Sequence, residues 1–197
     1  LQRAYDQLIH DVAVQNLDVT FALDRAGLVG EDGPTHSGNY DIAYLRCIPN
    51  VILMTPSSEN ETRLLLSTAY NHKGPAAVRY PRGTGPNSSI DPTLKSLEIG
   101  KARLVREGSS SIVFLNFGAL LDQAEIVSKE MDMTLIDMRF VKPLDEELLC
   151  KYLNNASMFL SLEDGSISGG AGSAVQEFCG RNNIIIKSML FGIPDEF

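Results

Sequence analysis

Short apolar runs alternate with amphipathic helical segments along almost the whole chain, and this alternation constrains the fold more than any other feature. Two of the runs, residues 111–115 and 184–186, lack the polar residue at every second position that a half-exposed strand shows. Such runs are typical of parallel strands whose two faces are both covered by helices. Because strands that alternate with helices define the α/β class, we expect mainly parallel sheets covered by helices.

The first 83 residues are predicted to form one α/β unit. Ser58 and Glu61 have the spacing of a capping box and predict where one of its helices begins. The expected helices span residues 1–15, residues 40–46 and a segment that starts after Ser58, and the expected strands span residues 18–23, 51–54 and 76–80.

Residues 98–197 repeat the alternation and predict a second unit. Pro143 and Asp145 stand where a proline and an N-cap residue open a helix, and Gly180 is expected to end another. The strands are expected at residues 99–105, 111–115, 133–137, 158–162 and 184–190, and the remaining helices at residues 119–129 and 174–179. Between the two units, residues 84–97 are predicted to be a linker, because breakers replace apolar periodicity there.

Composition excludes several classes of partner. With 44% hydrophobic and 21% charged residues, the chain falls among soluble globular proteins. Its net charge is -8 and it contains no block of Lys and Arg, which argues against a nucleic-acid surface. No apolar run approaches the ~20 residues that a membrane span needs, so no membrane partner is expected.

The three cysteines and the two chain ends suggest further expectations. Cys47, Cys150 and Cys179 are widely separated, so we expect reduced core cysteines rather than a zinc site or a disulfide framework. A helical stripe already runs at Leu1 and the chain stops soon after an expected strand, which we interpret as a piece of a longer protein.

A glycine-rich loop, residues 24–38, follows the first expected strand and is the best candidate site. Ligands of open α/β sheets bind at the carboxyl ends of strands, where this loop lies. Arg25, Asp32 and His36 supply a fixed cation, a carboxylate and a group that titrates near neutrality. The alternative is structural, with a turn at Asp32, a surface ion pair at Arg25 and a capping His36.

Two further segments have both a functional and a structural interpretation. Residues 78–83 end another strand, and Arg82 there either forms a phosphate clamp with Arg25 or belongs to a basic strand end. Residues 168–172 precede a helix and either cradle an anion or allow close helix packing. Packing is favoured for the second segment because it lacks the Lys-Ser/Thr of a P-loop. The acid pair at residues 163–164 is taken as structural.

Taken together, these motifs give the chain a resemblance to the 1-deoxy-D-xylulose 5-phosphate synthase family of transketolase-like enzymes. The resemblance runs nearly end to end. It is carried by residues 1–7 (LQRAYDQ), 24–38 (DRAGLVGEDGPTHSG), 44–49 (YLRCIP), 77–83 (AVRYPRG), 137–145 (DMRFVKPLD) and 169–173 (GGAGS).

The resemblance implies a fold and a reaction. Residues 1–83 would be the latter part of the pyrimidine-binding domain and residues 98–197 an incomplete C-terminal domain of a homodimeric, cytoplasmic bacterial enzyme, with a plastid location left open. Thiamine diphosphate and Mg²⁺ would serve as cofactors, held mainly by residues upstream of Leu1. The enzyme would join pyruvate to glyceraldehyde 3-phosphate with loss of carbon dioxide, at the start of non-mevalonate isoprenoid synthesis.

The resemblance also implies roles for individual residues. Arg25 and Arg82 would hold the phosphate of the aldehyde substrate, and Asp32 would contact that substrate or orient Arg25. His36 would hydrogen-bond the acceptor and assist proton transfer, and Arg3 would lie near the cofactor. The isolated segment is expected to be inactive. Two alternatives remain, a β-type subunit of a 2-oxo acid dehydrogenase and a non-catalytic dimerisation module.

Overall fold

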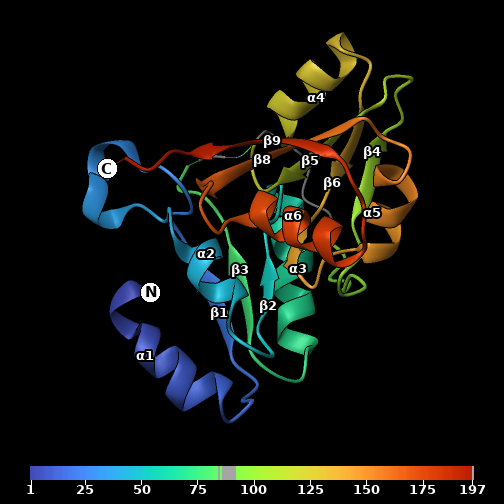
Figure 1. Cartoon of the computed structure of the whole chain (residues 1–197). Helices are drawn as coiled ribbons and strands as arrows, with labels where there is room; N and C mark the ends of the chain where they lie inside the picture. Colours follow the sequence, from blue (N-terminus) through green and yellow to red (C-terminus); the bar gives the residue numbers. More distant parts are fainter. Residues whose placement is uncertain (84, 86–91, 197) are drawn as a thin grey trace.

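The strands of the described residues form two sheets (Figure 1). A computed structural model describes residues 1–83, 85 and 92–196. The first sheet has the order β1-β3-β2-β7, made of β1 (Thr20–Leu23), β3 (Ala76–Arg79), β2 (Ile52–Met54) and β7 (Phe140–Lys142). The second sheet has the order β4-β6-β5-β8-β9, made of β4 (Arg103–Arg106), β6 (Thr134–Asp137), β5 (Ile112–Phe117), β8 (Met158–Ser166) and β9 (Lys187–Ile193). Neighbouring strands are parallel except where β7 pairs with β2 and β4 pairs with β6.

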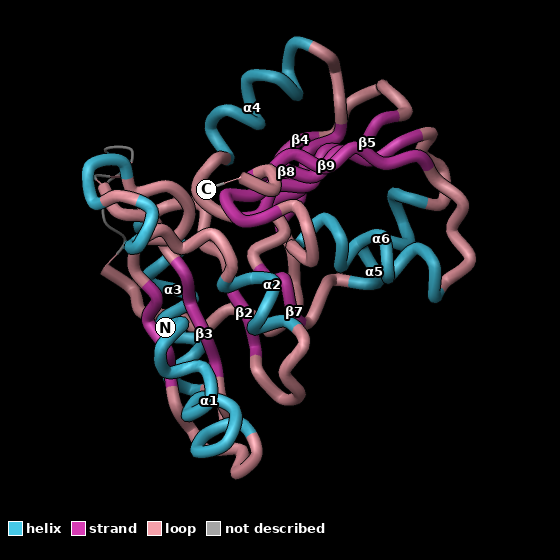
Figure 2. The backbone as a smooth tube through the Cα atoms, turned by 60° about the vertical axis from the view of Figure 1, so that its left-hand side comes forward, coloured by secondary structure: helices cyan, strands magenta, loops and turns pink. Residues whose placement is uncertain are grey.

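Helices connect and cover these strands (Figure 2). The N-terminal helical segment runs from Gln2 to Ala13 and changes from a 3-10 turn through α1 (Tyr5–Gln7) to a π-helix. The other α-helices are α2 (Asp41–Arg46), α3 (Glu59–Asn71), α4 (Leu121–Glu130), α5 (Glu146–Leu153) and α6 (Ala171–Arg181). No helix in the described part of the chain is long and apolar enough to cross a bilayer.

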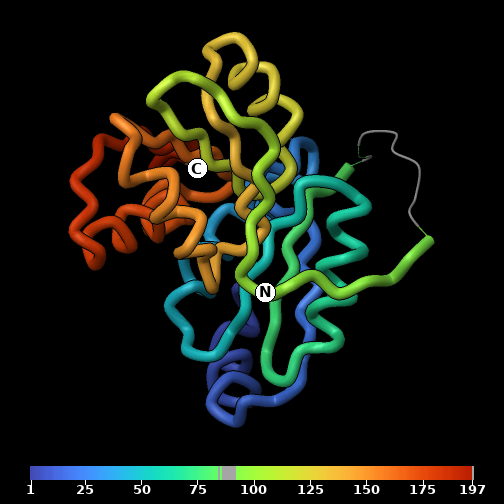
Figure 3. The backbone as a smooth tube through the Cα atoms, turned by 90° about the vertical axis from the view of Figure 1, so that its right-hand side faces the viewer, coloured from blue at the N-terminus to red at the C-terminus, as the bar shows by residue number. Residues whose placement is uncertain are grey.

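Each sheet is covered on both faces, and the layer of helices between the sheets packs against both of them. Helix α3 packs on the outer face of the first sheet and α4 on the outer face of the second (Figure 3). Residues of α2, α5 and α6 join residues of both sheets in one apolar cluster between them. The two sheets are therefore held together by a continuous core.

Strand β2 explains why the buried strands show no polar alternation. Ile52 and Met54 pack in the cluster under α3, whereas Leu53 faces the cluster shared by both sheets. Because both faces of the strand meet apolar partners, every position favours an apolar residue. The predicted α/β fold with two mainly parallel, helix-covered sheets is confirmed in this structure.

Strand β7 was missed by the sequence analysis. It lies in the second half of the chain but pairs antiparallel with β2 of the first sheet, through Leu53 opposite Lys142 and Met54 opposite Phe140. Three residues are too few to show a periodicity. The second half of the chain therefore contributes an edge strand to the sheet of the first half.

Some expected element ends are also corrected. Gly180 lies inside α6, and β8 continues to Ser166, beyond the end expected at residue 162. The cap of α3 is half of the predicted box, because Ser58 accepts a hydrogen bond from the amide of Glu61 while the Glu61 carboxylate binds Arg139. Within the linker predicted at residues 84–97, residues 84 and 86–91 lie outside the described residues, so that boundary stays a prediction.

The cysteines are free, but they are not all in the core. Cys179 is buried, Cys150 is half-buried and Cys47 is exposed. The expectation of core cysteines is therefore wrong for Cys47, which follows the last residue of α2.

A buried polar cluster crosses the junction between the two halves. Asp137, at the end of β6, is fully buried and accepts hydrogen bonds at Oδ2 from the Ser57 hydroxyl at 2.7 Å and from Arg103 at 3.0 Å. Nearby, Arg139 donates to Glu61 of α3 at 2.7 Å. Burial raises the pKa of Asp137, although Ser57 and Arg103 oppose the shift.

The raised pKa of Asp137 predicts a pH-dependent contribution to stability. The folded chain holds this proton to higher pH than the unfolded chain does, so the contribution is full below the ordinary value of 3.8 and falls as the pH rises through the folded value. We expect Asp137→Asn, which removes the buried charge, to gain free energy of unfolding relative to the wild type as the pH rises above 3.8 and through the folded value. Urea unfolding across that range measures the difference.

Asp132 provides a control of opposite sign. Its hydrogen bonds from Ser109 and Arg106 lower the pKa of this carboxyl to about 2, so its contribution is present above 3.8 and lost as the pH falls through the folded value. Asp132→Asn should therefore lose stability relative to the wild type as the pH rises from about 2 to about 4, which the same urea series measures when it is extended to pH 2. If Asp137→Asn also lost free energy of unfolding relative to the wild type as the pH rises, the prediction for Asp137 would be contradicted.

Candidate functional site

The loop of residues 24–38 leaves the carboxyl end of β1 and closes on itself at its base. Gly27 and Gly38 exchange two backbone hydrogen bonds of 3.0 Å, and the amide of Ala26 donates to the carbonyl of Tyr80 after β3. Gly27 has φ +72°, and a Cβ at position 38 would collide with the backbone carbonyl of Arg25. Glycine is therefore required at the closure.

Two short 3-10 turns, Gly30–Asp32 and Pro34–His36, form the tip of the loop. His36 is exposed there, and its Nδ1 lies 3.0 Å from the carbonyl oxygen of Asp32. Because a carbonyl oxygen only accepts, this contact forms with the tautomer that has its proton on Nδ1, and the Thr35 hydroxyl lies 3.1 Å from the same atom. In the neutral ring, Nε2 is then left as the acceptor.

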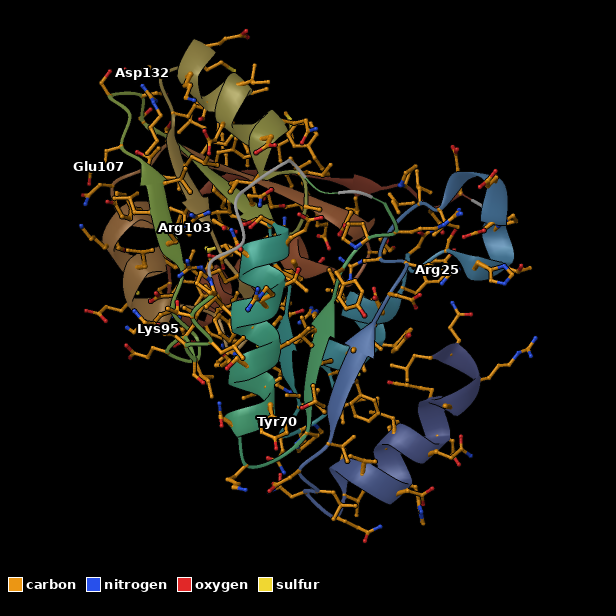
Figure 4. All side chains as sticks on the ribbon, turned by 180° about the vertical axis from the view of Figure 1, so that it is seen from behind. Arg25, Tyr70, Lys95, Arg103, Glu107 and Asp132 are labelled. Carbon is orange, nitrogen blue, oxygen red and sulfur yellow. The ribbon has the colours of Figure 1, made fainter. Side chains whose placement is uncertain are left out.

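Asp32 is the point on which the predicted site converges. Its Oδ2 lies 3.1 Å from Nε of Arg25 and 3.1 Å from an NH group of Arg82. The carboxylate therefore bridges two guanidinium groups that come from the ends of β1 and β3. Figure 4 shows Arg25 just beyond the end of β1, beside the loop.

Each of these arginines also has a second carboxylate partner. Arg25 pairs with Asp24, and Arg82 lies 3.2 Å from Glu31. The hydrogen bond to Asp32 and the charge of Asp24 raise the pKa of Arg25. Both guanidinium groups keep part of their surface open to solvent, with 38% and 43% of the side chain exposed, so donors remain for a ligand.

A cavity of about 580 Å³ opens beside the loop, within the range of small-molecule sites. It is lined by Arg25, by His36 and by Arg3 of the N-terminal helical segment. Arg82 does not line this cavity and borders a neighbouring one of about 570 Å³. Asp32 lines neither cavity, but its carboxylate joins Arg25, which lines the first, to Arg82, which lines the second.

Two residues of this site were missed by the sequence analysis. Tyr44 lines the larger cavity, and burial raises the pKa of its phenol. Its carbonyl accepts a hydrogen bond from the hydroxyl of Tyr5 at 2.6 Å, and the two rings meet edge to face with centroids 4.8 Å apart.

The second missed residue is Arg79, which was treated only as part of a basic strand end and is fully buried beneath the loop. Its position in the apolar strand β3 was the signal that could have identified it.

The glycine-rich segment before α6 packs closely and holds the protein's own carboxylate. Glu163 accepts hydrogen bonds from the amides of Ala171 at 2.8 Å and Gly172 at 2.9 Å, and so takes the position that an anion would occupy. A Cβ at Gly172 would meet Leu190 at 2.9 Å. This agrees with the packing interpretation of residues 168–172.

No group of three or more His, Cys, Asp or Glu side chains that could hold a metal ion occurs among the described residues.

Comparisons with known proteins agree with this architecture. The family model of the transketolase pyrimidine-binding domain matches residues 1–87, and that of the transketolase C-terminal domain matches residues 100–196. Among solved structures, a split-gene transketolase described as an inactive β4 tetramer superposes with a TM-score of 0.85. It is 26% identical, and the match covers 99% of this chain and 64% of that one.

Curated relatives are more similar in sequence. The 1-deoxy-D-xylulose-5-phosphate synthase of Hahella chejuensis is 57% identical over all 197 residues, and those of Pseudomonas syringae and Stutzerimonas stutzeri are 58% identical. The chain spans about 30% of the length of these relatives. With two transketolase domains matched and this identity along its whole length, the chain belongs to the transketolase-like proteins and groups within them with the 1-deoxy-D-xylulose-5-phosphate synthases.

Proposed function

We propose that this chain is a segment of a thiamine-diphosphate-dependent synthase, and that the segment binds the phosphate of the aldehyde substrate. The synthase would condense pyruvate with glyceraldehyde 3-phosphate to 1-deoxy-D-xylulose 5-phosphate and release carbon dioxide. The names and identities of its relatives support the reaction. The convergence of Arg25 and Arg82 on Asp32 supports the binding role.

The arginine pair has the chemistry of a phosphate clamp. A guanidinium group has five N–H donors in a planar fork and binds phosphate through two of them. Asp32 uses one donor of each arginine and keeps both groups near one point before a ligand arrives. The remaining donors can then reach phosphate oxygens without a large rearrangement, which lowers the entropic cost of binding.

His36 would act on the carbonyl end of the acceptor. Its Nδ1 contact with the Asp32 carbonyl leaves Nε2 as the atom that exchanges a proton. A neutral ring accepts a proton there, and an imidazolium donates one to an oxygen that gains negative charge.

The cofactors are assigned mainly to parts of the enzyme other than this segment. Bound thiamine diphosphate would supply the carbanion equivalent, and the protein would supply orientation and charge. Arg3, which lines the same cavity as Arg25 and His36, is the residue of this segment that would approach an anionic group of the cofactor or substrate. We place the ligands of Mg²⁺ outside residues 1–197, in a homodimeric cytoplasmic enzyme.

The clamp is tested in the full-length enzyme with Arg25→Ala and Arg82→Ala. Each loss of a charge-assisted contact should raise KM for glyceraldehyde 3-phosphate by about tenfold or more, while KM for pyruvate stays near the wild-type value. Steady-state kinetics with each substrate varied in turn measures both constants. Arg181→Ala is a matched control, because Arg181 is an exposed arginine at the end of α6 that pairs with Glu146. Unchanged KM values in both variants would leave the loop with a structural role and favour the dimerisation module.

The segment alone is predicted to be inactive. The chain spans about 30% of the length of its curated relatives, and a structurally similar split-gene transketolase is described as an inactive tetramer. We expect no 1-deoxy-D-xylulose 5-phosphate from the isolated chain with pyruvate, glyceraldehyde 3-phosphate, thiamine diphosphate and Mg²⁺. Product detected by mass spectrometry above the level of a heat-inactivated sample would refute the assignment of the cofactor site to other parts.

A further inference from the structure

Arg79 is an arginine buried in the interior, directly beneath the base of the loop. It is the last residue of β3, and 1% of its side chain is exposed. Desolvation alone would lower its pKa, but Asp164 and Asp41 outweigh that effect and raise it, so the group stays charged. A buried charge of this kind persists only where its partners satisfy it.

The guanidinium group of Arg79 joins three elements that are distant in sequence. Its Nε donates a hydrogen bond to Asp41, the first residue of α2, at 2.9 Å, and its Nη2 donates one to the carbonyl of Gly38 at 3.0 Å. The other side of the fork pairs with the carboxylate of Asp164 in β8. Arg79 thus connects the closure of the loop to a strand of the second sheet.

Strand β8 also contacts the loop base directly. An added Cβ at Gly27 would lie 2.9 Å from the carbonyl oxygen of Asp164, so the two backbones are nearly in contact. Two residues further on, the amide of Ser166 donates to the carbonyl of Asn39 at 2.7 Å. The end of β8 lies over α2 in Figure 1. Both ends of the loop therefore rest on the second sheet.

We propose that Arg79 and Asp164 are positioning residues through which the second sheet sets the loop of residues 24–38 and, with it, selectivity for a phosphorylated acceptor. The proposal rests on the proposed function, because it assigns a cause to the placement of Arg25 and Asp32. Neither Arg79 nor Asp164 touches the substrate in this scheme. Their contribution is to hold the loop base, from which the arginine pair and His36 project.

The test uses Asp164→Asn and Arg79→Lys in the full-length enzyme. Asparagine keeps the shape of the side chain without its charge, and lysine keeps the charge without the fork that reaches three partners. The readout is the ratio of kcat/KM for glyceraldehyde 3-phosphate to kcat/KM for unphosphorylated D-glyceraldehyde. A displaced clamp should lower this ratio by about tenfold or more, with KM for pyruvate unchanged.

A second measurement reports the loop without activity. Amide hydrogen exchange of peptides that cover residues 26–38 should be faster in both variants, because Gly27 and Gly38 lose the support of β8. Arg139→Lys is the matched control. Arg139 also joins the two halves of the chain, through Glu61, and only 16% of its side chain is exposed, but neither residue contacts the loop in the described structure.

The outcomes separate this proposal from the proposed function. The inference is overturned if Asp164→Asn and Arg79→Lys keep the wild-type ratio and loop exchange, or if Arg139→Lys changes both as much as they do. If Arg79→Lys does not fold, Asp164→Asn decides alone. Suppose that Arg25→Ala and Arg82→Ala leave KM for the aldehyde unchanged while loop exchange still rises in Asp164→Asn. The proposed phosphate clamp is then refuted, and so is the claim that the second sheet sets selectivity through it.

Discussion

The apolar core between the two sheets is the interaction on which the rest of this structure depends. Helices α2, α5 and α6 pack there against strands of both sheets, and three of the side chains that meet are Leu45, Leu149 and Phe178, each fully buried. Removal of this surface from water is the main driving force that brings the two halves together. The loop base, Arg79 and β8 acquire their relative positions from this contact.

Sequence patterns predicted the fold class because its causes are local. Apolar runs without alternation indicated strands covered on both faces, and Asp145 was correctly predicted to cap a helix, since it accepts the amide of Leu148. Strand β7 could not be predicted in this way, because its three residues are specified by their partner β2 and not by their own period. The end of α6 was missed for a similar reason, since packing against the sheets outweighs the low helix propensity of Gly180.

The candidate site was predictable in its members and less so in its arrangement. Glycines and charged residues after β1 indicated Arg25, Asp32 and His36, and Arg82 followed from the end of a second strand. That one oxygen of Asp32 serves both arginines depends on the turns at residues 30–36, which bring it between the two strand ends. Arg79 depends on contacts with Gly38 and Asp164, which lie 41 and 85 residues away in sequence.

The glycines of the loop differ in how much change they can accept. A methyl group at Gly38 has no space, and one at Gly27 would press on Asp164, whereas one at Gly30 or Gly33 would meet no atom within 4 Å and would face only the strain of a positive φ. Tolerance to an added side chain at these glycines should thus increase from the base of the loop to the turns at its tip. Natural variants with an altered range of acceptors would accordingly carry their changes at the tip and share an invariant base.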